Sequence, residues 1–328
     1  MRLVQVTYAG ASRAGTVVDD AVLLLPEGET VQTIVEAGVE SLGATAERAA
    51  QGETVSLGDV IFEVPLAPRT LRDFVAFEEH VIGVRSSIEG NPGVPEAWYD
   101  APTFYFSNPH TVVATGTDVR IPAQSQALDF EMEVGLVIGR EGRDVSEGDA
   151  RDHIFGLTIF NDWSARDIQM REMQVGLGPA KGKDFAGTLG PWIVTYDEFD
   201  DVRDSEGFLD LWGTVELNGE VVGRDLLSNI GWTFEQMVAY ASRDSRIVPG
   251  DVLGSGTFGN GGCLAELWGI NGERRPAPLK HGDVVTVSIE RIGTVTNRIV
   301  TGSVPTPTPR PRLRDREAIR AARSAGGA

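Results

Sequence analysis

Apolar and acidic residues alternate in one short stretch, and this pattern restricts the fold more than any other feature of the chain. The alternation is strict over residues 128–134, so an extended strand would place Asp129, Glu131 and Glu133 together on one face. The chain then runs into residues 135–139, which have the composition of a strand buried on both faces. Neighbouring carboxylates beside a buried strand repel one another and are costly to desolvate unless a cation joins them. The stretch therefore predicts a divalent metal site.

The surrounding chain is rich in short β-forming runs separated by Gly, Asn and Asp, without regular alternation of strands and long helices. The predicted strands cover residues 119–122, 130–138, 154–160, 192–195, 211–217, 251–255 and 283–292. The pairs Asn218-Gly219 and Asn271-Gly272 predict hairpin turns. This pattern predicts an α+β, β-dominated fold built on a mixed roll or barrel, and not a doubly wound sheet.

Three segments are expected along the chain. Residues 1–66 predict a small N-terminal α/β domain, in which residues 31–51 have the composition of one helix. Residues 69–304 form the main body, and they follow a Pro-containing linker. Residues 305–328 are rich in Pro and Arg and predict a flexible tail, with a subunit-docking arm as the alternative.

Composition excludes several classes of function. The chain has 328 residues and a formal net charge of −19, which argues against nucleic-acid binding, and it has no apolar run long enough to span a membrane. Cys263 is the single cysteine, so no intrachain disulfide can form and a cytoplasmic location is expected. The four histidines show no His-x-x-x-His spacing. A metal would therefore take oxygen ligands, which favours Mg²⁺ or Mn²⁺, with Ca²⁺ also compatible.

A second acidic position follows the predicted strand 154–160. Asp162 ends this strand and occupies the N-cap position of a predicted helix over residues 163–173. Arg166 and Gln169 lie four and seven residues further on, on the same helical face. A carboxylate, a guanidinium and an amide would then converge on one point, which suits an anionic or dicarbonyl ligand. A purely structural N-cap is the alternative for Asp162.

Four more residues are candidates with open alternatives. Lys183 lies in a tight Gly-rich loop and either reaches into a cleft or is a surface lysine. Asp73 and His80 lie two turns apart in a predicted helix over residues 72–80, where a histidine is more often structural than catalytic. Glu266 lies in an apolar, strand-like context and needs a partner if it is buried.

Together these segments resemble the fumarylacetoacetate hydrolase superfamily, in particular bacterial fumarylacetoacetase-like proteins. The motifs are Asp-Phe-Glu-x-Glu at 129–133, Asn-Asp-Trp-Ser-Ala-Arg-Asp-Ile-Gln at 161–169, Gly-Pro-x-x-Gly-Lys at 178–183 and Ser-Gly-Thr at 255–257. The resemblance covers residues 69–302. It implies a β-roll core with a small N-terminal domain, a homodimer, and a Mg²⁺ or Mn²⁺ site.

The resemblance also implies roles for individual residues. Four carboxylates match its metal ligands: Asp73, Glu131, Glu133 and Asp162. His80 matches a catalytic histidine, and Glu266 matches the glutamate that orients it. The positions that hold the substrate or its oxyanion are matched by Arg166, Gln169, Lys183, Tyr105 and Thr257.

The expected activity is metal-dependent hydrolysis of the C–C bond of a 1,3-diketo acid, an acylpyruvate or a fumarylacetoacetate-like compound, in the catabolism of aromatic or related compounds. The same scaffold also supports decarboxylation of 2-oxo diacids and hydration or isomerisation of 2-oxo-enoates, and a non-catalytic metal-binding or structural protein is a further alternative. A His80–Glu266 pair favours hydrolysis, because decarboxylation needs no activated water. The expected partner is a small oxo acid or diketone, without nucleic acid or membrane. Residues 81–100 are expected to form a lid that determines specificity.

Overall fold

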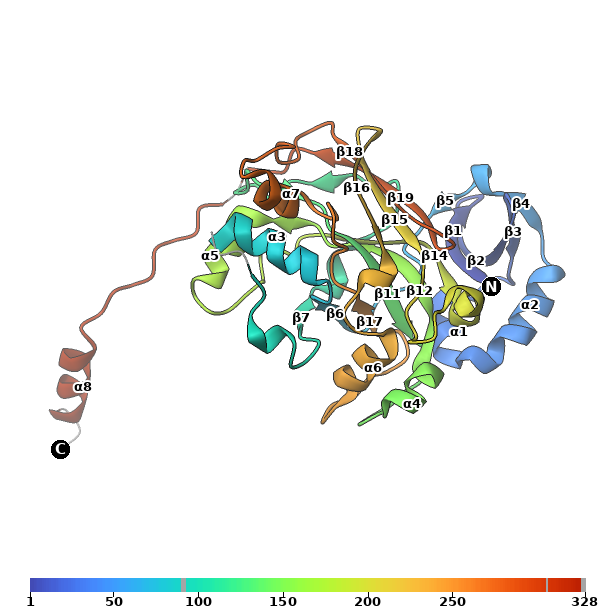
Figure 1. Cartoon of the computed structure of the whole chain (residues 1–328), viewed down its shortest axis with the longest axis horizontal. Helices are drawn as coiled ribbons and strands as arrows, with labels where there is room; N and C mark the ends of the chain where they lie inside the picture. The colour runs from blue at the N-terminus through green and yellow to red at the C-terminus, as the bar shows by residue number, and fades with distance from the viewer. Residues whose placement is uncertain (90–92, 305, 326–328) are drawn as a thin grey trace.

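The computed structural model of the chain describes residues 1–89, 93–304 and 306–325. Figure 1 shows the main body at the centre, the N-terminal strands and helices at one side, and the C-terminal tail extending away from the other side. Gly90, Asn91 and Pro92, which belong to the segment predicted as a lid, lie outside the described residues.

Strands are more numerous than helices in the described part of the chain. In chain order the strands are β1 Arg2–Tyr8, β2 Ala11–Val18, β3 Ala21–Leu24, β4 Thr54–Ser56, β5 Ile61–Phe62, β6 Leu71–Phe74, β7 Phe104–Ser107, β8 Val112–Val113, β9 Val119–Arg120, β10 Leu128–Asp129, β11 Met132–Ile138, β12 Ile154–Asn161, β13 Ser164–Ala165, β14 Gly187–Thr195, β15 Trp212–Leu217, β16 Glu220–Leu226, β17 Val252–Gly254, β18 Val284–Ile289 and β19 Gly293–Val300. The helices are α1 Val31–Ala37, α2 Leu42–Ala50, α3 Glu78–Glu89, α4 Glu147–Ala150, α5 Arg166–Met173, α6 Phe234–Ser242, α7 Leu264–Asn271 and α8 Arg316–Ala325.

Two large sheets form the core. The first follows the order β4-β3-β2-β1-β14-β12-β11-β17-β6-β7, with β5 paired to β1 and β8 paired to β14. The second has the order β16-β15-β18-β19-β9 and packs against β11, β12 and β14 of the first. These mixed sheets, with helices at their edges and ends, confirm the predicted α+β, β-dominated fold (Figure 1).

The strands β11 and β12 position most of the acidic residues. They pair antiparallel with Met132 opposite Asn161, so the start of β11 lies beside the end of β12. Both strands are buried along their whole length, because the second sheet covers one face and N-terminal residues, among them Val31 and Val35, pack on the other. The acidic alternation that precedes them is buried as well, from residue 128 to 134. An acidic strand face pointing to water is therefore excluded here.

The N-terminal segment continues the main sheet. Strand β1 pairs antiparallel with β14, so the first strands extend the central sheet at its edge. The predicted boundary between residues 66 and 69 stays a prediction. The predicted single helix over residues 31–51 is wrong, because Gly38, with φ of 80°, ends α1 and the chain restarts as α2.

Three further local predictions are wrong. Residues 72–80 are not one helix: Leu71–Phe74 is the buried strand β6, parallel to β17, and α3 begins only at Glu78. Glu266 lies on helix α7 and not on a strand. The Asn271-Gly272 pair ends α7, with Gly272 in the left-handed region, whereas Asn218-Gly219 forms the predicted hairpin between β15 and β16.

The tail contains a helix that the sequence analysis did not predict. Helix α8 covers Arg316–Ala325, and the described tail residues from 306 onward are exposed. Within the described ranges, no helix is both long and apolar enough to cross a membrane.

Candidate active site

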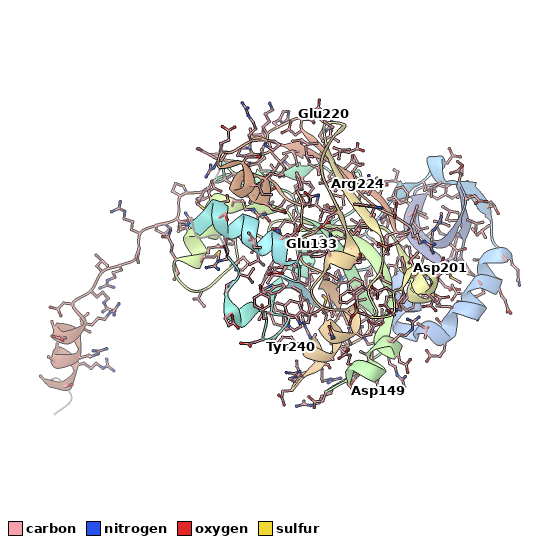
Figure 2. All side chains as sticks on the ribbon, in the orientation of Figure 1. Glu133, Asp149, Asp201, Glu220, Arg224 and Tyr240 are labelled. Atoms are coloured by element: carbon pink, nitrogen blue, oxygen red, sulfur yellow. The ribbon has the colours of Figure 1, made fainter. Side chains whose placement is uncertain are left out.

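Four predicted carboxylates meet at one end of the strands β12, β11 and β6, with β17 lying between β11 and β6 in the sheet. Asp73 lies in β6 and Glu133 in β11, while Glu131 precedes β11 and Asp162 follows β12. Asp73, Glu131 and Glu133 each offer an oxygen atom within 4.8 Å of the other two. All four side chains are buried, and Figure 2 shows Glu133 inside the body. The structure thus brings together the residues that the sequence predicted as metal ligands.

Lys183 and Tyr105 connect Asp162 to this cluster. The Nζ atom of Lys183 forms ion pairs with Glu131 and, at 2.7 Å, with Asp162. The hydroxyl of Tyr105, on β7, donates to Asp73 Oδ2 at 2.8 Å and also contacts Asp162. Lys183 is buried, so the alternative that it is a surface lysine is wrong.

The predicted N-cap role of Asp162 is also wrong. Helix α5 begins at Arg166, three residues later than expected, and its N-cap residue is Ala165. Ser164 and Ala165 instead form the short strand β13, which pairs with β10. The carboxylate of Asp162 is therefore directed to Lys183 and Tyr105 and not to the helix.

Burial and mutual repulsion disfavour full ionisation of this cluster. Burial, followed by repulsion from a neighbouring carboxylate, raises the pKa of Asp73 to about 8. Burial and the charge of Asp73 raise the pKa of Glu133 well above its usual range. For Glu131, burial favours the protonated form, but Arg166 and Lys183 outweigh it and hold the pKa well below its usual range. The two cations therefore do not neutralise all of the carboxylates.

The donor set fits a divalent cation that prefers oxygen ligands. Asp73 Oδ1 and Asp162 Oδ1 are buried, and neither has a hydrogen-bond partner among the described residues. Gly254 lets two carboxylates lie close against the backbone of β17, since a Cβ atom there would lie 2.4 Å from Asp73 Oδ1 and 2.9 Å from Glu133 Oε2. Mg²⁺, Mn²⁺ and Ca²⁺ all take carboxylate oxygens. Glu131, which shares the cluster, completes the group that would hold such an ion.

Replacing Gly254 with alanine should weaken metal binding, because the added methyl group must displace the Asp73 carboxylate. The expected loss of Mn²⁺ affinity is about tenfold or more, as is usual when the surroundings of a metal ligand are disturbed. Isothermal titration calorimetry with Mn²⁺ measures it. Gly43→Ala is the matched control, because nothing lies within 4 Å of a Cβ atom at that position. Equal Mn²⁺ affinity in the two variants would contradict this placement of the ion.

His80 lies beside the cluster as a neutral imidazole. Its Nε2 atom is 3.7 Å from Glu131 Oε1, and its Nδ1 atom is 3.7 Å from the sulfur of Cys263. Burial lowers the pKa of His80 to about 4, so the ring is uncharged at neutral pH. An uncharged imidazole next to a carboxylate cluster can accept a proton.

Glu266 lies in the first turn of α7, close to the helix that carries His80. Helix α3 packs so tightly against it that a Cβ atom on Gly83 would lie 2.4 Å from Glu266 Cγ. Burial raises the pKa of Glu266 to about 8, and the nearby backbone N–H groups of Gly261 and Asn260 oppose this rise only in part. Glu266 Oε2 has no hydrogen-bond partner in the part of the chain that the structure describes. The orientation of His80 by Glu266 stays a prediction.

Arg166 and Gln169 contact each other, and Arg166 reaches the acidic cluster through Glu131 and not through Asp162. The guanidinium of Arg166 is buried and donates through Nη2 to Glu131 at 2.7 Å and through Nη1 to Gln169 Oε1 at 3.1 Å. Because the amide oxygen of Gln169 is occupied, its amide nitrogen remains to donate to a ligand. Arg166 therefore orients both the Glu131 carboxylate in the cluster and the Gln169 amide beside it.

Asp129 is a functional candidate that sequence reasoning missed. It is fully buried, and its Oδ2 atom accepts from Arg166 Nε at 2.8 Å. Its carboxylate also accepts from the backbone N–H groups of Leu264 and Ala265 at 2.7 Å and 3.0 Å, at the N-terminus of α7. The alternation of acids predicted its burial, but its partners are distant in sequence. Asp129 thus joins Arg166 to the helix that carries Glu266.

Two other contacts concern the segment that follows β17. The hydroxyl of Thr257 donates to Glu133 Oε1 at 3.2 Å, and the Gly256 N–H donates to Glu133 Oε2 at 3.1 Å. Thr257 therefore supports a carboxylate of the cluster, and its predicted contact with substrate stays a prediction. Cys263, which the sequence did not single out as part of the site, is the N-cap residue of α7 and contacts His80.

The model of the family described as "Fumarylacetoacetate (FAA) hydrolase C-terminal" matches residues 69–300. The chain belongs to the fumarylacetoacetate hydrolase family. The match confirms the resemblance expected from the four motifs.

The relatives of this fumarylacetoacetate hydrolase family protein are named after different activities. The chain is 31% identical over 279 residues to the fumarylacetoacetase of Arabidopsis thaliana, with 69% of the chain and 66% of that protein covered. It is 31% identical over 276 residues to the mitochondrial oxaloacetate tautomerase FAHD2A of Homo sapiens, with 83% and 80% covered. The chain spans 61% to 66% of the length of the first three curated relatives, so their activities are not transferred directly.

Solved structures show the same family fold. The 5-carboxymethyl-2-hydroxymuconate delta-isomerase from Mycobacterium smegmatis is 25% identical, with a TM-score of 0.66 over 92% of this chain and 100% of that one. The maleylpyruvate hydrolase from Sphingobium sp. SYK-6, solved with manganese(II) and pyruvate, is 20% identical, with a TM-score of 0.69 over 92% and 100%. Family membership shows an enzyme scaffold used by hydrolases, isomerases and tautomerases.

Proposed function

We propose that this family member is a metal-dependent hydrolase that cleaves the C–C bond of a 1,3-diketo acid, an acylpyruvate or fumarylacetoacetate-like compound. The observation that carries the proposal is the neutral imidazole of His80, 3.7 Å from a carboxylate of the buried acidic cluster. A base in this position suits activation of water, which hydrolysis needs and decarboxylation does not. The proposal includes Mg²⁺ or Mn²⁺ at the cluster, a homodimer, and a role in the catabolism of aromatic or related compounds.

Different residues of the chain would act in different steps of this reaction. The carboxylates of the cluster would hold a divalent cation, which when bound would supply Lewis-acid stabilisation of enolate charge. His80 Nε2 accepts a proton from water, whose oxygen attacks the acyl carbonyl carbon. Lys183 and the Gln169 amide donate to the oxyanion, and each such donor is worth about 3 kcal/mol. The C–C bond breaks, the acyl group leaves as a carboxylic acid, and the proton from His80 passes to the carbon of the pyruvate enolate.

A second candidate is tautomerisation of a 2-oxo diacid such as oxaloacetate. Two observations favour it: Glu266 Oε2 has no hydrogen-bond partner among the described residues, and the human oxaloacetate tautomerase is matched over 83% of the chain. Moving a proton between carbon and the enol oxygen needs a base and enolate stabilisation, but no attack by water. The alternatives named from the sequence, 2-oxo-diacid decarboxylation and 2-oxo-enoate hydration or isomerisation, share this enolate step.

One set of assays separates these reactions. Mg²⁺-loaded protein is offered acetylpyruvate, fumarylpyruvate, fumarylacetoacetate and oxaloacetate in parallel, and products are identified by NMR. Hydrolysis predicts two carboxylic-acid products from a diketo acid. Keto–enol exchange of oxaloacetate with the diketo acids untouched would replace the hydrolase proposal with the tautomerase, and CO₂ release would replace it with the decarboxylase. No turnover, together with Mg²⁺ binding, would favour a non-catalytic metal-binding protein.

Metal affinity should rise with pH. Metal ligation needs the ionised carboxylate, and the pKa of Asp73 in the metal-free protein is about 8. Protons therefore compete with the ion below that pH, and the competition fades as the pH passes above it. Calorimetric titration with Mn²⁺ at pH 6.5, 7.5 and 8.5 should give progressively tighter binding, with proton release at the lower values. An affinity that does not change over this range would contradict the assignment of Asp73 as a ligand.

A further inference from the structure

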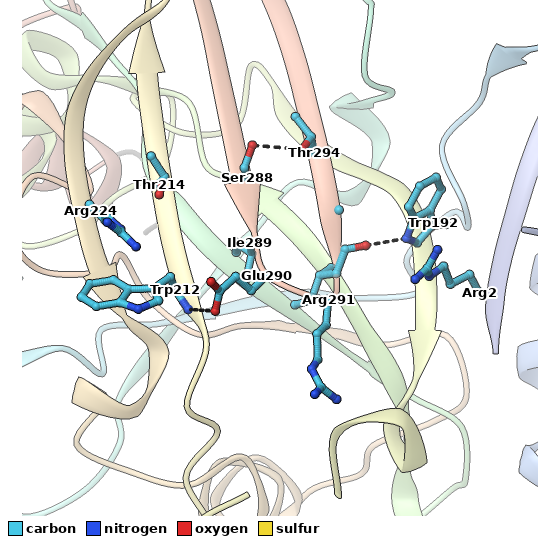
Figure 3. Close-up of a pocket in the computed structure, with 12 residues that line it drawn as sticks. Arg2, Trp192, Trp212, Thr214, Arg224, Ser288, Ile289, Glu290, Arg291 and Thr294 are labelled. Carbon is cyan, nitrogen blue, oxygen red and sulfur yellow. Dashed lines mark hydrogen bonds between the residues drawn. The ribbon is translucent and has the colours of Figure 1, made fainter. Parts of the chain in front are cut away.

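A hollow of about 440 Å³ lies on the outer face of the second sheet, and none of its lining residues belongs to the candidate active site. Figure 3 shows two tryptophan–arginine pairs at opposite sides of it. Trp212 and Arg224 come from the neighbouring strands β15 and β16. Trp192 and Arg2 come from β14 and β1 of the first sheet. The hollow therefore lies where the two sheets meet.

Both arginines keep their hydrogen-bonding edges available. The Cζ atom of Arg224 is 4.1 Å from the centre of the Trp212 ring, and that of Arg2 is 5.9 Å from the centre of the Trp192 ring. Neither arginine forms an ion pair with a carboxylate in the described part of the chain, although the chain carries a net charge of −19. A guanidinium that lies against an indole face still presents its N–H groups at the edge, in the geometry that binds carboxylates.

The remaining charged groups of the hollow are already engaged. Arg291 forms a bidentate ion pair with Asp201, at 2.5 Å and 2.7 Å. Glu290 accepts a hydrogen bond from the backbone N–H of Trp212 at 3.0 Å. Hydroxyl groups line the part between the two tryptophan–arginine pairs, and they belong to Thr214, Ser288 and Thr294. The Ser288 and Thr294 hydroxyls bond to each other at 2.9 Å. The hollow thus offers two cations without an ion pair and two aromatic walls to a ligand.

We propose that this hollow binds a small aromatic dicarboxylate, with one carboxylate at Arg224, the other at Arg2, and the ring between the two indoles. Charge-assisted bonds from guanidinium to carboxylate are among the stronger polar contacts in proteins. The volume is within the range of about 300–1,000 Å³ typical of sites for small molecules. Two cations at opposite sides match a dianion, and the tryptophans match a flat apolar body.

Calorimetry on the full-length, Mg²⁺-loaded protein tests the proposal with terephthalate as the probe. We expect saturable binding of terephthalate, and weaker binding of benzoate, which has one charge, and of trans-cyclohexane-1,4-dicarboxylate, which has no aromatic ring. Arg224→Gln and Arg2→Gln should each weaken terephthalate binding about tenfold, through loss of one charge-assisted contact. Arg298→Gln is the matched control, because this exposed arginine of β19 pairs with Asp118 outside the hollow. The control should bind terephthalate like the unmodified protein.

Three results would overturn the proposal. Absence of terephthalate binding at 10 mM is one. Equal binding in Arg224→Gln, Arg2→Gln and Arg298→Gln is another, because it would place the anion elsewhere, including in the active site. The third is that sedimentation shows a dimer of the unmodified protein, that the Arg224→Gln variant is a monomer, and that terephthalate does not change the dimer. That result would make the hollow an interface between two copies of the chain.

Discussion

The His80→Ala variant is expected to lose about 10²- to 10⁴-fold in kcat on a diketo acid, the range typical of removing a general base. It should bind Mn²⁺ like the unmodified protein, because all carboxylates of the cluster remain in place. His80 is only a neighbour of the cluster, with its Nε2 atom 3.7 Å from Glu131 Oε1. The neutral ring is the only described histidine in contact with the cluster. Steady-state kinetics on acetylpyruvate and calorimetry with Mn²⁺ together measure the two properties.

The control for this variant is His110→Ala, which removes an exposed histidine. Turnover of His80→Ala close to that of the control would contradict the role of His80 as a base. Loss of Mn²⁺ binding together with turnover would assign His80 to the metal site or to folding, and not to activation of water. Thermal unfolding of both variants separates a folding defect from the other two explanations.

The second large effect is expected for Asp129→Ala, as a loss of about 3 kcal/mol or more in the free energy of unfolding. The substitution removes a buried partner of the Arg166 guanidinium and leaves the Leu264 and Ala265 N–H groups without their acceptor. Asp129→Asn keeps an acceptor oxygen and should lose less stability. Urea unfolding followed by circular dichroism measures both variants.

Asp59→Ala is the control for the Asp129 variants, since Asp59 is exposed. A midpoint of urea unfolding for Asp129→Ala equal to that of this control would contradict the importance of the buried network. If Asp129→Ala does not fold, Asp129→Asn carries the test. Asp129→Asn is also expected to lower kcat more than it raises KM, because Arg166 orients Glu131 and Gln169 rather than the free substrate.

The parts of the site that lie on long, periodic strands were predictable from the sequence. Residues 130–138 and 154–160 are strongly apolar, so they identified β11 and β12 within a few residues. Antiparallel pairing then places Glu131 beside Asp162, which the sequence could suggest but not demonstrate. Electrostatics alone supports the prediction of a cation beside these acids. Burying neighbouring carboxylates together is costly unless a cation neutralises them.

The parts on short or non-local elements were not predictable in the same way. Strand β6 is only four residues long, and so short an apolar run does not distinguish a strand from a helix. Asp73 and His80 were therefore assigned to one helix, whereas they reach the site from β6 and α3 separately. The contact of His80 with Cys263 and the network of Asp129 depend on helix α7, which is more than 100 residues away from either in the sequence. Only tertiary packing reveals such contacts.

The most direct test of the central claim follows the oxygen of water. Mg²⁺-loaded protein is incubated with acetylpyruvate in H₂¹⁸O, and the products are analysed by mass spectrometry after correction for exchange in a reaction without protein. Attack of an activated water on the acyl carbonyl predicts one ¹⁸O atom in the carboxylate of acetate, with pyruvate as the second product. Unchanged acetylpyruvate, together with protein-dependent keto–enol exchange of oxaloacetate, would contradict C–C hydrolysis and assign the site to tautomerisation.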